Sequence, residues 1–229
     1  LDTKVPTLNM LKSGIYSSSN TSPIFSTSFG SSGGNTVCKN ISINNINVTT
    51  ISSITGIGNY QLQCTATSNA GKSVTKIGTY NLVGIFNSSY YLACTTFSNI
   101  DYCRTNETSL IIPGPKNNDN FSVSAQYGPY FKIQSGCYKI IYNGNNLDNS
   151  EIIYEVHQSN PNIKYNILAL TTTNDTASYY INITDSLLNN NWDYLNKASG
   201  IEFSLYNYST VDIIINSITV QYVDSCPTS

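Results

Sequence analysis

The sequence has little charge: only 10% of its 229 residues are Asp, Glu, Lys or Arg, against roughly 25% in an average soluble protein. The 11 basic and 13 acidic residues nearly cancel, and they are scattered rather than gathered in a stripe. A chain without a basic patch offers no electrostatic surface to nucleic acid or to an anionic membrane. We therefore expect neither as a partner, and a surface made polar by Asn, Ser, Thr and Tyr.

Long apolar runs are also missing, because no stretch of 18 or more apolar residues occurs. No segment is therefore expected to span a membrane. The sequence starts at Leu1 without an initiator Met. We interpret this start as the mature end left by a removed signal peptide or as the start of an excised fragment.

Metal and nucleotide motifs are absent as well. The chain has one histidine, His157, and no Cys-x-x-Cys pair, so we expect no metal site and no cofactor. Gly71-Lys72-Ser73 ends like a phosphate-binding loop, but Ala66 stands where its first glycine belongs. The flanking runs are strand-like, which favours a β-hairpin with a turn at residues 68–71.

The best candidate for acid–base chemistry is the run at 151–158, EIIYEVHQ. Strand alternation puts Ile152, Tyr154 and Val156 on one face. The other face then carries four residues: Glu151, Ile153, Glu155 and His157. This second face is either a small metal-binding or sugar-binding surface or a solvated strand face, and the avoidance of cores by unpaired carboxylates favours the solvated face. No catalytic pair or triad stands out, so we expect no enzyme.

Short runs of β-branched and aromatic residues, separated by Asn, Gly, Ser and Pro, predict an all-β chain. The sequence pattern changes after residue 84, and we place a boundary there: two β-sandwich domains at 1–84 and 85–229. The segment 185–195 is the one helical-turn candidate, with Asp185 as its cap. The expected strands are 5–11, 22–29, 35–43, 47–54, 59–67, 72–83, 90–97, 109–114, 120–127, 130–134, 137–144, 151–158, 162–173, 178–184, 201–209 and 211–223.

Six cysteines, an even number, predict three disulfides formed in an oxidising compartment. The chain is therefore expected to be extracellular or on the cell surface.

Cys64-x-Ala66 with Gly71 seven residues after the cysteine resembles the F strand and F–G turn of immunoglobulin-like domains. The resemblance implies a sandwich at 1–84 with a disulfide from Cys64 back to Cys38. Three features depart from the family: Leu62 replaces the expected tyrosine, the core tryptophan is missing because Trp192 lies in the other half, and only 25 residues lie between the two cysteines.

The runs 178–184 and 200–223 resemble the last strands of jelly-roll domains of the galactose-binding type. This resemblance implies a jelly-roll-like sandwich at 85–229, with Cys137 joined to Cys226 and Cys94 to Cys103. Aromatic rings stack on sugars in carbohydrate-binding members of that family. Trp192, Tyr194 and Tyr208 are the candidates for such a contact here, and a core position for Trp192 is the alternative.

Nine Asn-x-Ser/Thr sequons are candidate N-glycosylation sites, although roughly seven or eight would arise by chance at this composition. A chain exported through a glycosylating pathway would carry glycans at many of these asparagines, and the glycans would also cover sheet edges. The nine asparagines are Asn20, Asn40, Asn47, Asn87, Asn106, Asn120, Asn174, Asn182 and Asn207.

Two functions follow as hypotheses. The first is a glycosylated structural protein, a subunit of a cell-surface filament or pilus or an adhesin. The composition is similar to secreted thread or pilus subunits of AT-rich archaea and to amoebozoan surface adhesins. Such a subunit would associate with itself, with other surface proteins or with glycans, and residues 1–20 would be donated as a strand to a neighbour. The alternative is a carbohydrate-binding module of a secreted protein.

Overall fold

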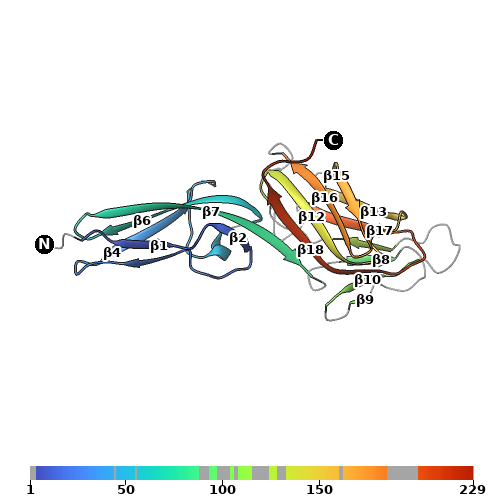
Figure 1. Cartoon of the computed structure of the whole chain (residues 1–229), viewed down its shortest axis with the longest axis horizontal. Helices are drawn as coiled ribbons and strands as arrows, with labels where there is room; N and C mark the ends of the chain where they lie inside the picture. The colour runs from blue at the N-terminus through green and yellow to red at the C-terminus, as the bar shows by residue number, and fades with distance from the viewer. Residues whose placement is uncertain are drawn as a thin grey trace. The chain divides into compact units, whose positions relative to one another are not determined.

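The computed structural model describes residues 4–43, 45–54, 56–87, 93–96, 104–105, 108–114, 124–127, 133–159, 162–184 and 201–228 (Figure 1). The regular secondary structure of these residues is β-strand, with antiparallel pairing except at one strand, and one short 3-10 helix. The all-β prediction is therefore confirmed. The chain divides into two compact units, residues 1–83 and 84–229.

Unit 1 contains two sheets. One pairs β1 with β3, and the other has the order β2-β7-β6-β4-β5, in which only β2 is parallel to its neighbour. The strands are β1 (Thr7–Met10), β2 (Gly14–Ser17), β3 (Phe25–Ser28), β4 (Gly34–Asn40), β5 (Ile46–Asn47), β6 (Gly58–Ser68) and β7 (Ser73–Phe86), whose last three residues belong to unit 2.

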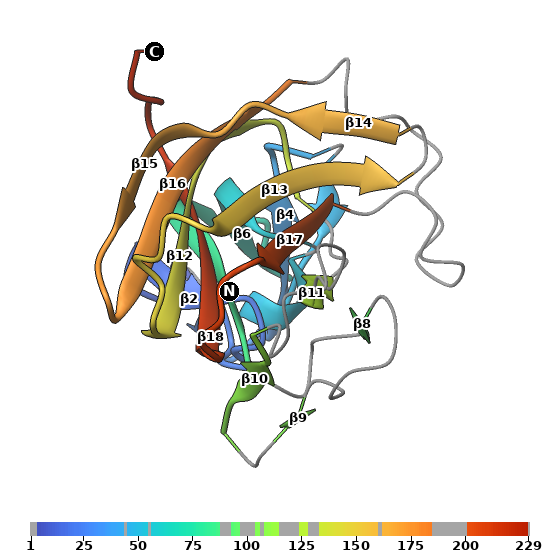
Figure 2. The ribbon, with the colours of Figure 1, turned by 90° about the vertical axis from the view of Figure 1, so that its right-hand side faces the viewer.

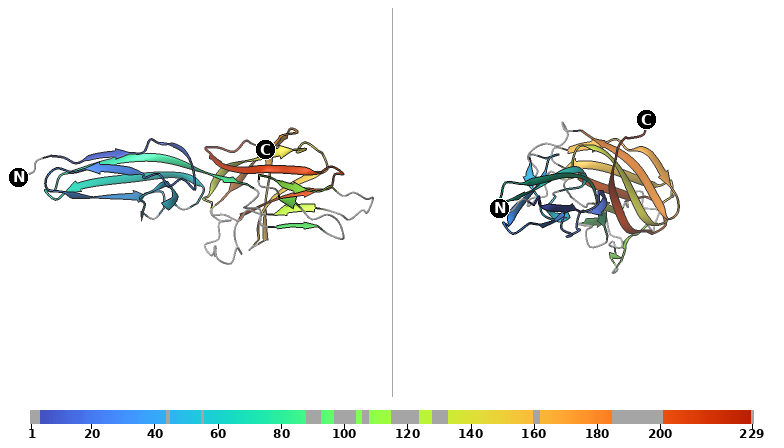
Figure 3. Two further views of the ribbon diagram at one scale, coloured as in Figure 1. Left: turned by 90° about the horizontal axis from the view of Figure 1, so that it is seen from below. Right: turned by 60° about the vertical axis from the view of Figure 1, so that its left-hand side comes forward.

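The core of unit 1 lies between these two sheets (Figure 3). Along β6 every second residue is buried, which is the alternation of an antiparallel strand with one face on a core. Leu8 of β1 supplies an apolar side chain from the opposite sheet. Tyr80 is fully buried, and its hydroxyl donates a hydrogen bond to the carbonyl of Leu11 at 2.8 Å. Unit 1 is thus a small β-sandwich.

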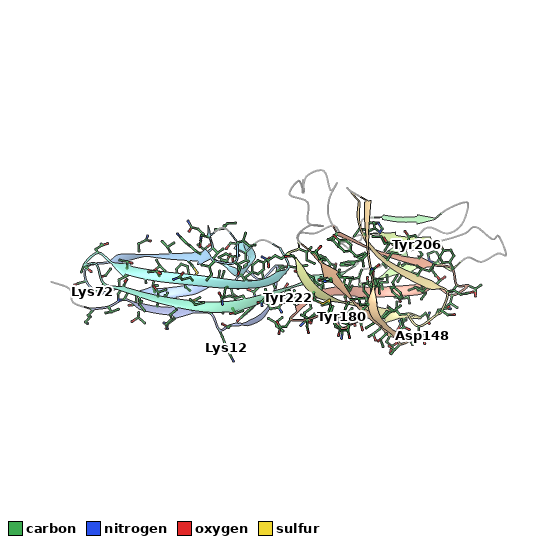
Figure 4. All side chains as sticks on the ribbon, turned by 90° about the horizontal axis from the view of Figure 1, so that it is seen from above. Lys12, Lys72, Asp148, Tyr180, Tyr206 and Tyr222 are labelled. Atoms are coloured by element: carbon green, nitrogen blue, oxygen red, sulfur yellow. A yellow bond between two sulfur atoms is a disulfide. The ribbon has the colours of Figure 1, made fainter. Side chains whose placement is uncertain are left out.

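The β6–β7 hairpin occupies the stretch that resembles a phosphate-binding loop. Gly71 has a φ of +81°, and its N–H donates to the carbonyl of Ser68 at 2.9 Å. Glycine adopts this left-handed conformation without steric cost. Lys72, labelled in Figure 4, is exposed at the tip. The Gly-Lys-Ser tripeptide therefore builds a turn.

Cys38 and Cys64 form a disulfide, with Cα atoms 3.9 Å apart. They lie directly opposite each other on β4 and β6, which are neighbours in one sheet. In immunoglobulin domains the corresponding bond joins the two sheets. The short spacing between the cysteines explains the difference, because it leaves room only for the small β5 and η1 segment between adjacent strands.

The expected strand at 47–54 is wrong after its first residue, since the chain forms the 3-10 helix η1 (Ile51–Ser53). The Ser53 hydroxyl accepts hydrogen bonds from the N–H groups of Thr49 and Thr50, at 3.0 and 3.1 Å. It also donates to the carbonyl of Thr50 at 2.6 Å. These local bonds satisfy the backbone groups that a strand would pair with a neighbour.

Unit 2 also contains two sheets. One has the order β15-β16-β12-β18. In this sheet β10 pairs with one part of β18 and β9 pairs with β10, while the end of β7 pairs with another part of β18. The other has the order β14-β13-β17-β11-β8. The strands are β8 (Ala93–Thr96), β9 (Arg104–Thr105), β10 (Leu110–Ile112), β11 (Ser124–Tyr127), β12 (Gly136–Asn145), β13 (Ile152–Ser159), β14 (Asn162–Tyr165), β15 (Leu168–Thr172), β16 (Thr176–Ile183), β17 (Ile201–Asn207) and β18 (Ile213–Val223).

The core of unit 2 is rich in tyrosine and lies between β12, β16 and β18 on one side and β13 and β17 on the other. Figure 2 shows the backbone of these strands. Tyr142 packs edge-on against Tyr154, with ring centroids 5.4 Å apart, and Tyr179 lies 6.1 Å from Tyr154. The Tyr154 hydroxyl donates to the carbonyl of Leu147 at 2.9 Å, and burial raises the pKa of Tyr154. Unit 2 is therefore a second β-sandwich.

The single strand expected at 162–173 is two strands in two different sheets. β14 pairs with β13, whereas β15 pairs with β16. The switch takes place at residues 166–167, and Ala169 has a φ of +47° where the register of β15 shifts. An alternating sequence gives no sign of such a corner, because both halves keep a strand period.

A second disulfide joins Cys137, at the start of β12, to Cys226, which follows β18. The Cα atoms are 5.4 Å apart. These two strands already pair, with Cys137 opposite Val223, so the bond fixes the end of an existing ladder. Cys103 and the segment 185–195 lie outside the described residues, as does the side chain of Cys94.

Candidate functional site

The second face of β13 carries the polar residues singled out in the sequence. Ile152, Tyr154 and Val156 are buried against the core, between 0 and 8% exposed. Ile153 is 46% exposed on the other face, which it shares with Glu155 and His157. The alternation predicted for this strand is confirmed.

The neighbouring strand β17 supplies partners for these side chains. Its register places Glu202 opposite His157 and Ser204 opposite Glu155. The Nε2 atom of His157 lies 2.8 Å from Oε1 of Glu202, and the Ser204 hydroxyl donates to the same oxygen at 3.1 Å. Glu202 therefore accepts two hydrogen bonds at one carboxylate oxygen.

A second ion pair lies beside the first. Lys164 of β14 is opposite His157 in register, and its ammonium group contacts Glu155 diagonally across the strands. The side chain of Lys164 is 66% exposed and that of Glu155 is 23% exposed, whereas Glu202 is 3% exposed and Ser204 is fully buried. We call this surface the polar face; it comprises Glu155, His157, Lys164, Glu202, Ser204 and Tyr206.

The pKa of His157 is raised above its usual value of about 6.5. The main cause is the hydrogen bond to Glu202, which favours the protonated ring, and burial opposes it. The negative charge of Glu155 acts in the same direction as Glu202. The charge of a protonated His157 has the same sign as that of Lys164 and the opposite sign to those of Glu155 and Glu202.

The order of hydrogen bonds on this face differs from that of a serine hydrolase. In such a triad the histidine lies between serine and acid and removes the serine proton. Here Glu202 lies between Ser204 and His157. Within the described part of the chain, no group of three or more His, Cys, Asp or Glu side chains is arranged to hold a metal ion.

Of the three predicted sugar-contact residues, Tyr208 lies among the residues that the structure describes. Tyr208 follows the end of β17 and is 46% exposed. It lies six positions from Glu202, which is roughly 20 Å along an extended strand. Trp192 and Tyr194 lie outside the described residues, so their contact with sugar stays a prediction.

The sequence analysis missed Glu202 and Ser204. The run IEFSLYN does alternate, with Phe203 between the two polar residues and Leu205 directly after them. This signal was available, but the register that brings β17 beside β13 depends on pairing between residues about 45 positions apart. Local pattern does not determine such a register.

The N-terminal segment proposed as a donor strand contributes to its own unit. Leu8 is 2% exposed in the unit 1 core, and β2 pairs with β7 from Gly14 to Ser17. Donation to a neighbour would expose Leu8 and remove that pairing. Strand exchange stays a prediction, and it would require the loss of these contacts within unit 1.

The candidate glycosylation sites differ in exposure. Asn47, Asn87, Asn174 and Asn182 are exposed, Asn20 is half-buried, and Asn40 and Asn207 are buried. Asn106 and Asn120 lie outside the described residues. No helix among the residues that the structure describes is long and apolar enough to cross a membrane.

Comparisons with known proteins find no matching family model and no matching curated protein. Among solved structures, one of carbohydrate-binding modules from the β-sandwich superfamily aligns over 98% of this chain and 99% of its own, with 9% identity and a TM-score of 0.28. A Clostridium perfringens ZmpB structure, with a carbohydrate-binding module in complex with GlcNAc, aligns over 95% and 48%, with 9% identity and a TM-score of 0.29.

A third similar structure is the secreted serine protease VesC from Vibrio cholerae. It aligns over 96% of this chain and 49% of its own, with 11% identity and a TM-score of 0.23. At TM-scores this low, none of the three similarities supports an argument about function. The two disulfides among the described residues, in contrast, fit an extracellular protein directly.

Proposed function

We propose that this chain is a non-enzymatic binding module of a secreted protein, and that unit 2 binds an uncharged carbohydrate on the polar face. The observation that supports this proposal is the buried carboxylate of Glu202, held by His157 and Ser204. Removing a carboxylate from water costs several kcal/mol, and apolar residues at the same positions usually serve stability as well or better. A role in binding gives a reason for keeping the charge.

The charge balance of the polar face indicates the type of ligand. Two cations, Lys164 and protonated His157, face two carboxylates, Glu155 and Glu202. A face with no net charge favours neither an anion nor a cation. A neutral ligand rich in hydroxyl groups can both donate to the carboxylates and accept from the ammonium and imidazole groups.

The geometry also limits how freely these polar groups move. Glu202 is fixed by two hydrogen bonds at one oxygen, and Glu155 is held by Lys164. Side chains that are already positioned lose less entropy when a ligand binds. Tyr206 lies on the same face as Ser204, two positions along β17, and offers an aromatic ring beside the polar groups.

Binding is favoured over the filament hypothesis by the placement of the N-terminal segment. β1 and β2 complete unit 1, so exchange between copies would have to break contacts already present.

Titration calorimetry of the full chain with a panel of neutral oligosaccharides, and with uronic-acid counterparts of the same size, tests the proposal. We expect measurable binding of at least one neutral sugar and weaker binding of its acidic counterpart. Lys164→Ala should weaken the binding of the neutral sugar at least about tenfold, since hydrogen bonds to charged groups contribute about 1.5–3 kcal/mol.

Lys139→Ala is the matched control. Lys139 lies on the other sheet of unit 2, over the ring of Tyr180 at 5.7 Å, and Figure 4 labels that tyrosine. This variant should leave the affinity within twofold of the parent chain. The proposal is wrong if no neutral sugar binds, or if the two lysine variants weaken binding equally.

A further inference from the structure

The sequons fall into two groups when they are placed in the fold. Six of these tripeptides lie wholly within the described residues. Three end in Ser and begin at Asn20, Asn40 and Asn207; three end in Thr and begin at Asn47, Asn174 and Asn182. The two groups have different surroundings.

Both polar atoms of the Asn207 side-chain amide form hydrogen bonds inside the protein. The side chain is fully buried, and Nδ2 donates to the carbonyls of Ile112 at 3.2 Å and Val211 at 2.9 Å. Oδ1 accepts from the N–H of Ser209 at 3.0 Å and from its hydroxyl at 2.7 Å. A glycan on Nδ2 would remove one of these donor hydrogens and would have no room.

The other two Asn-x-Ser tripeptides form the same turn. Oδ1 of Asn40 accepts from the N–H of Ser42 at 3.1 Å, and Oδ1 of Asn20 accepts from the N–H of Ser22 at 2.7 Å. Asn40 is only 2% exposed. An asparagine that binds the backbone two residues later forms an Asx turn, which is a structural use of the side chain.

The Asn-x-Thr tripeptides present their asparagines to solvent. Asn47 is exposed on β5, and Asn174 is exposed in the turn between β15 and β16. Asn182 is exposed on β16, where it alternates with the buried Ile181 and Ile183. A glycan at these positions displaces no core contact.

We infer that, among these six sequons, Asn47, Asn174 and Asn182 are N-glycosylation sites, and that Asn40 and Asn207 are unmodified turn residues. In the reaction, Nδ2 of the asparagine forms a bond to the anomeric carbon of an oligosaccharide carried on a polyprenyl pyrophosphate. The bond from that carbon to the pyrophosphate breaks, and Nδ2 loses one proton. A chain modified at Asn207 before folding could not bury that side chain, so it would be absent from the folded protein.

This assignment places no glycan on the strands that carry the polar face. Asn174 and Asn182 belong to the sheet of β15, β16, β12 and β18, whereas the polar face lies on β14, β13 and β17. The inference does not depend on the proposed function, because glycans are located without adding any ligand.

The test is to secrete the full chain from N-glycosylating cells and isolate the folded monomer. Treatment with peptide-N-glycosidase in ¹⁸O-water converts each glycosylated asparagine to ¹⁸O-labelled aspartate, which peptide mass spectrometry locates. We expect label at Asn47, Asn174 and Asn182 and none at Asn40 and Asn207. A second secreted protein with a known glycan, made in the same cells, confirms that the pathway works.

Two variants distinguish an asparagine that accepts a glycan from an asparagine that forms a buried turn. Asn182→Gln should lower the mass by one glycan and leave the melting temperature unchanged within about 1 °C. Asn207→Gln should leave the glycan mass unchanged but lower the melting temperature by about 5 °C or more, because it disturbs several buried hydrogen bonds. Label at Asn207 in folded monomer, or no label at any of the three Thr sequons beside a labelled control, would overturn the inference.

Discussion

The two units are both antiparallel sandwiches with a disulfide between neighbouring strands, but they differ in what they bury. The buried polar residues of unit 1 are uncharged, Asn40 and Ser68, among the residues that the structure describes there. Unit 2 buries Glu202 next to the only histidine of the chain. The described core of unit 1 therefore buries no charged group, whereas unit 2 keeps ionisable groups that packing alone would not require.

The disulfides provide the largest expected difference between the units. Cross-linking residues 89 positions apart, as in unit 2, stabilises by about 4.6 kcal/mol in the chain-entropy account, and 26 positions, as in unit 1, by about 3.5 kcal/mol. We expect Cys137→Ser with Cys226→Ser to destabilise unit 2 more than Cys38→Ser with Cys64→Ser destabilises unit 1. Denaturant unfolding followed by hydrogen exchange in each unit measures both; the reverse order would contradict the prediction.

The contribution of the N-terminal segment is the next largest effect. Leu8→Ala should destabilise unit 1 by about 2–3 kcal/mol, since the side chain is buried in that core and its loss leaves a cavity. Val5, which is 57% exposed, supplies the control: Val5→Ala should change stability by less than about 0.5 kcal/mol. Equal, small effects of both variants would show that the segment is not part of the unit 1 core in solution.

The smallest predicted effect is a pH dependence confined to unit 2. The folded-state pKa of His157 is raised, so its contribution to stability is complete below about pH 6.5 and is lost as the pH rises through the raised pKa. Unit 1 has no histidine and should show no such loss in this window. Glu202→Gln should remove most of the dependence. Hydrogen exchange at several pH values, corrected for the intrinsic exchange rate, measures the stability of the two units separately.

Much of the local structure could be predicted from the sequence. Alternation grouped Ile152, Tyr154 and Val156 on the face that proves to be buried, and turn chemistry predicted the turn that ends at Gly71. Both features depend on neighbours in sequence, for which strand period and glycine conformation are sufficient. The pairing of Cys38 with Cys64 came from a family resemblance, although the bond lies within one sheet rather than between two.

The features that sequence analysis missed depend on contacts between distant segments. The parallel pairing of β2 with β7 joins Gly14–Ser17 to residues 80–83, and the polar face joins β13 to β17. Neither register is visible in a local pattern. The switch of the chain from β14 to β15 was missed for a related reason, because a corner between sheets keeps the same alternation on both sides.

The bond between Cys137 and Cys226 also has a mechanical consequence. A force that pulls on the two ends of the chain passes through this covalent link and does not reach the strands between the two cysteines. At about 3.4 Å per residue, the 89 positions that it encloses correspond to roughly 300 Å of chain that cannot be pulled out. Tension would therefore leave β13 and β17, and the polar face between them, inside a closed loop until the disulfide is reduced.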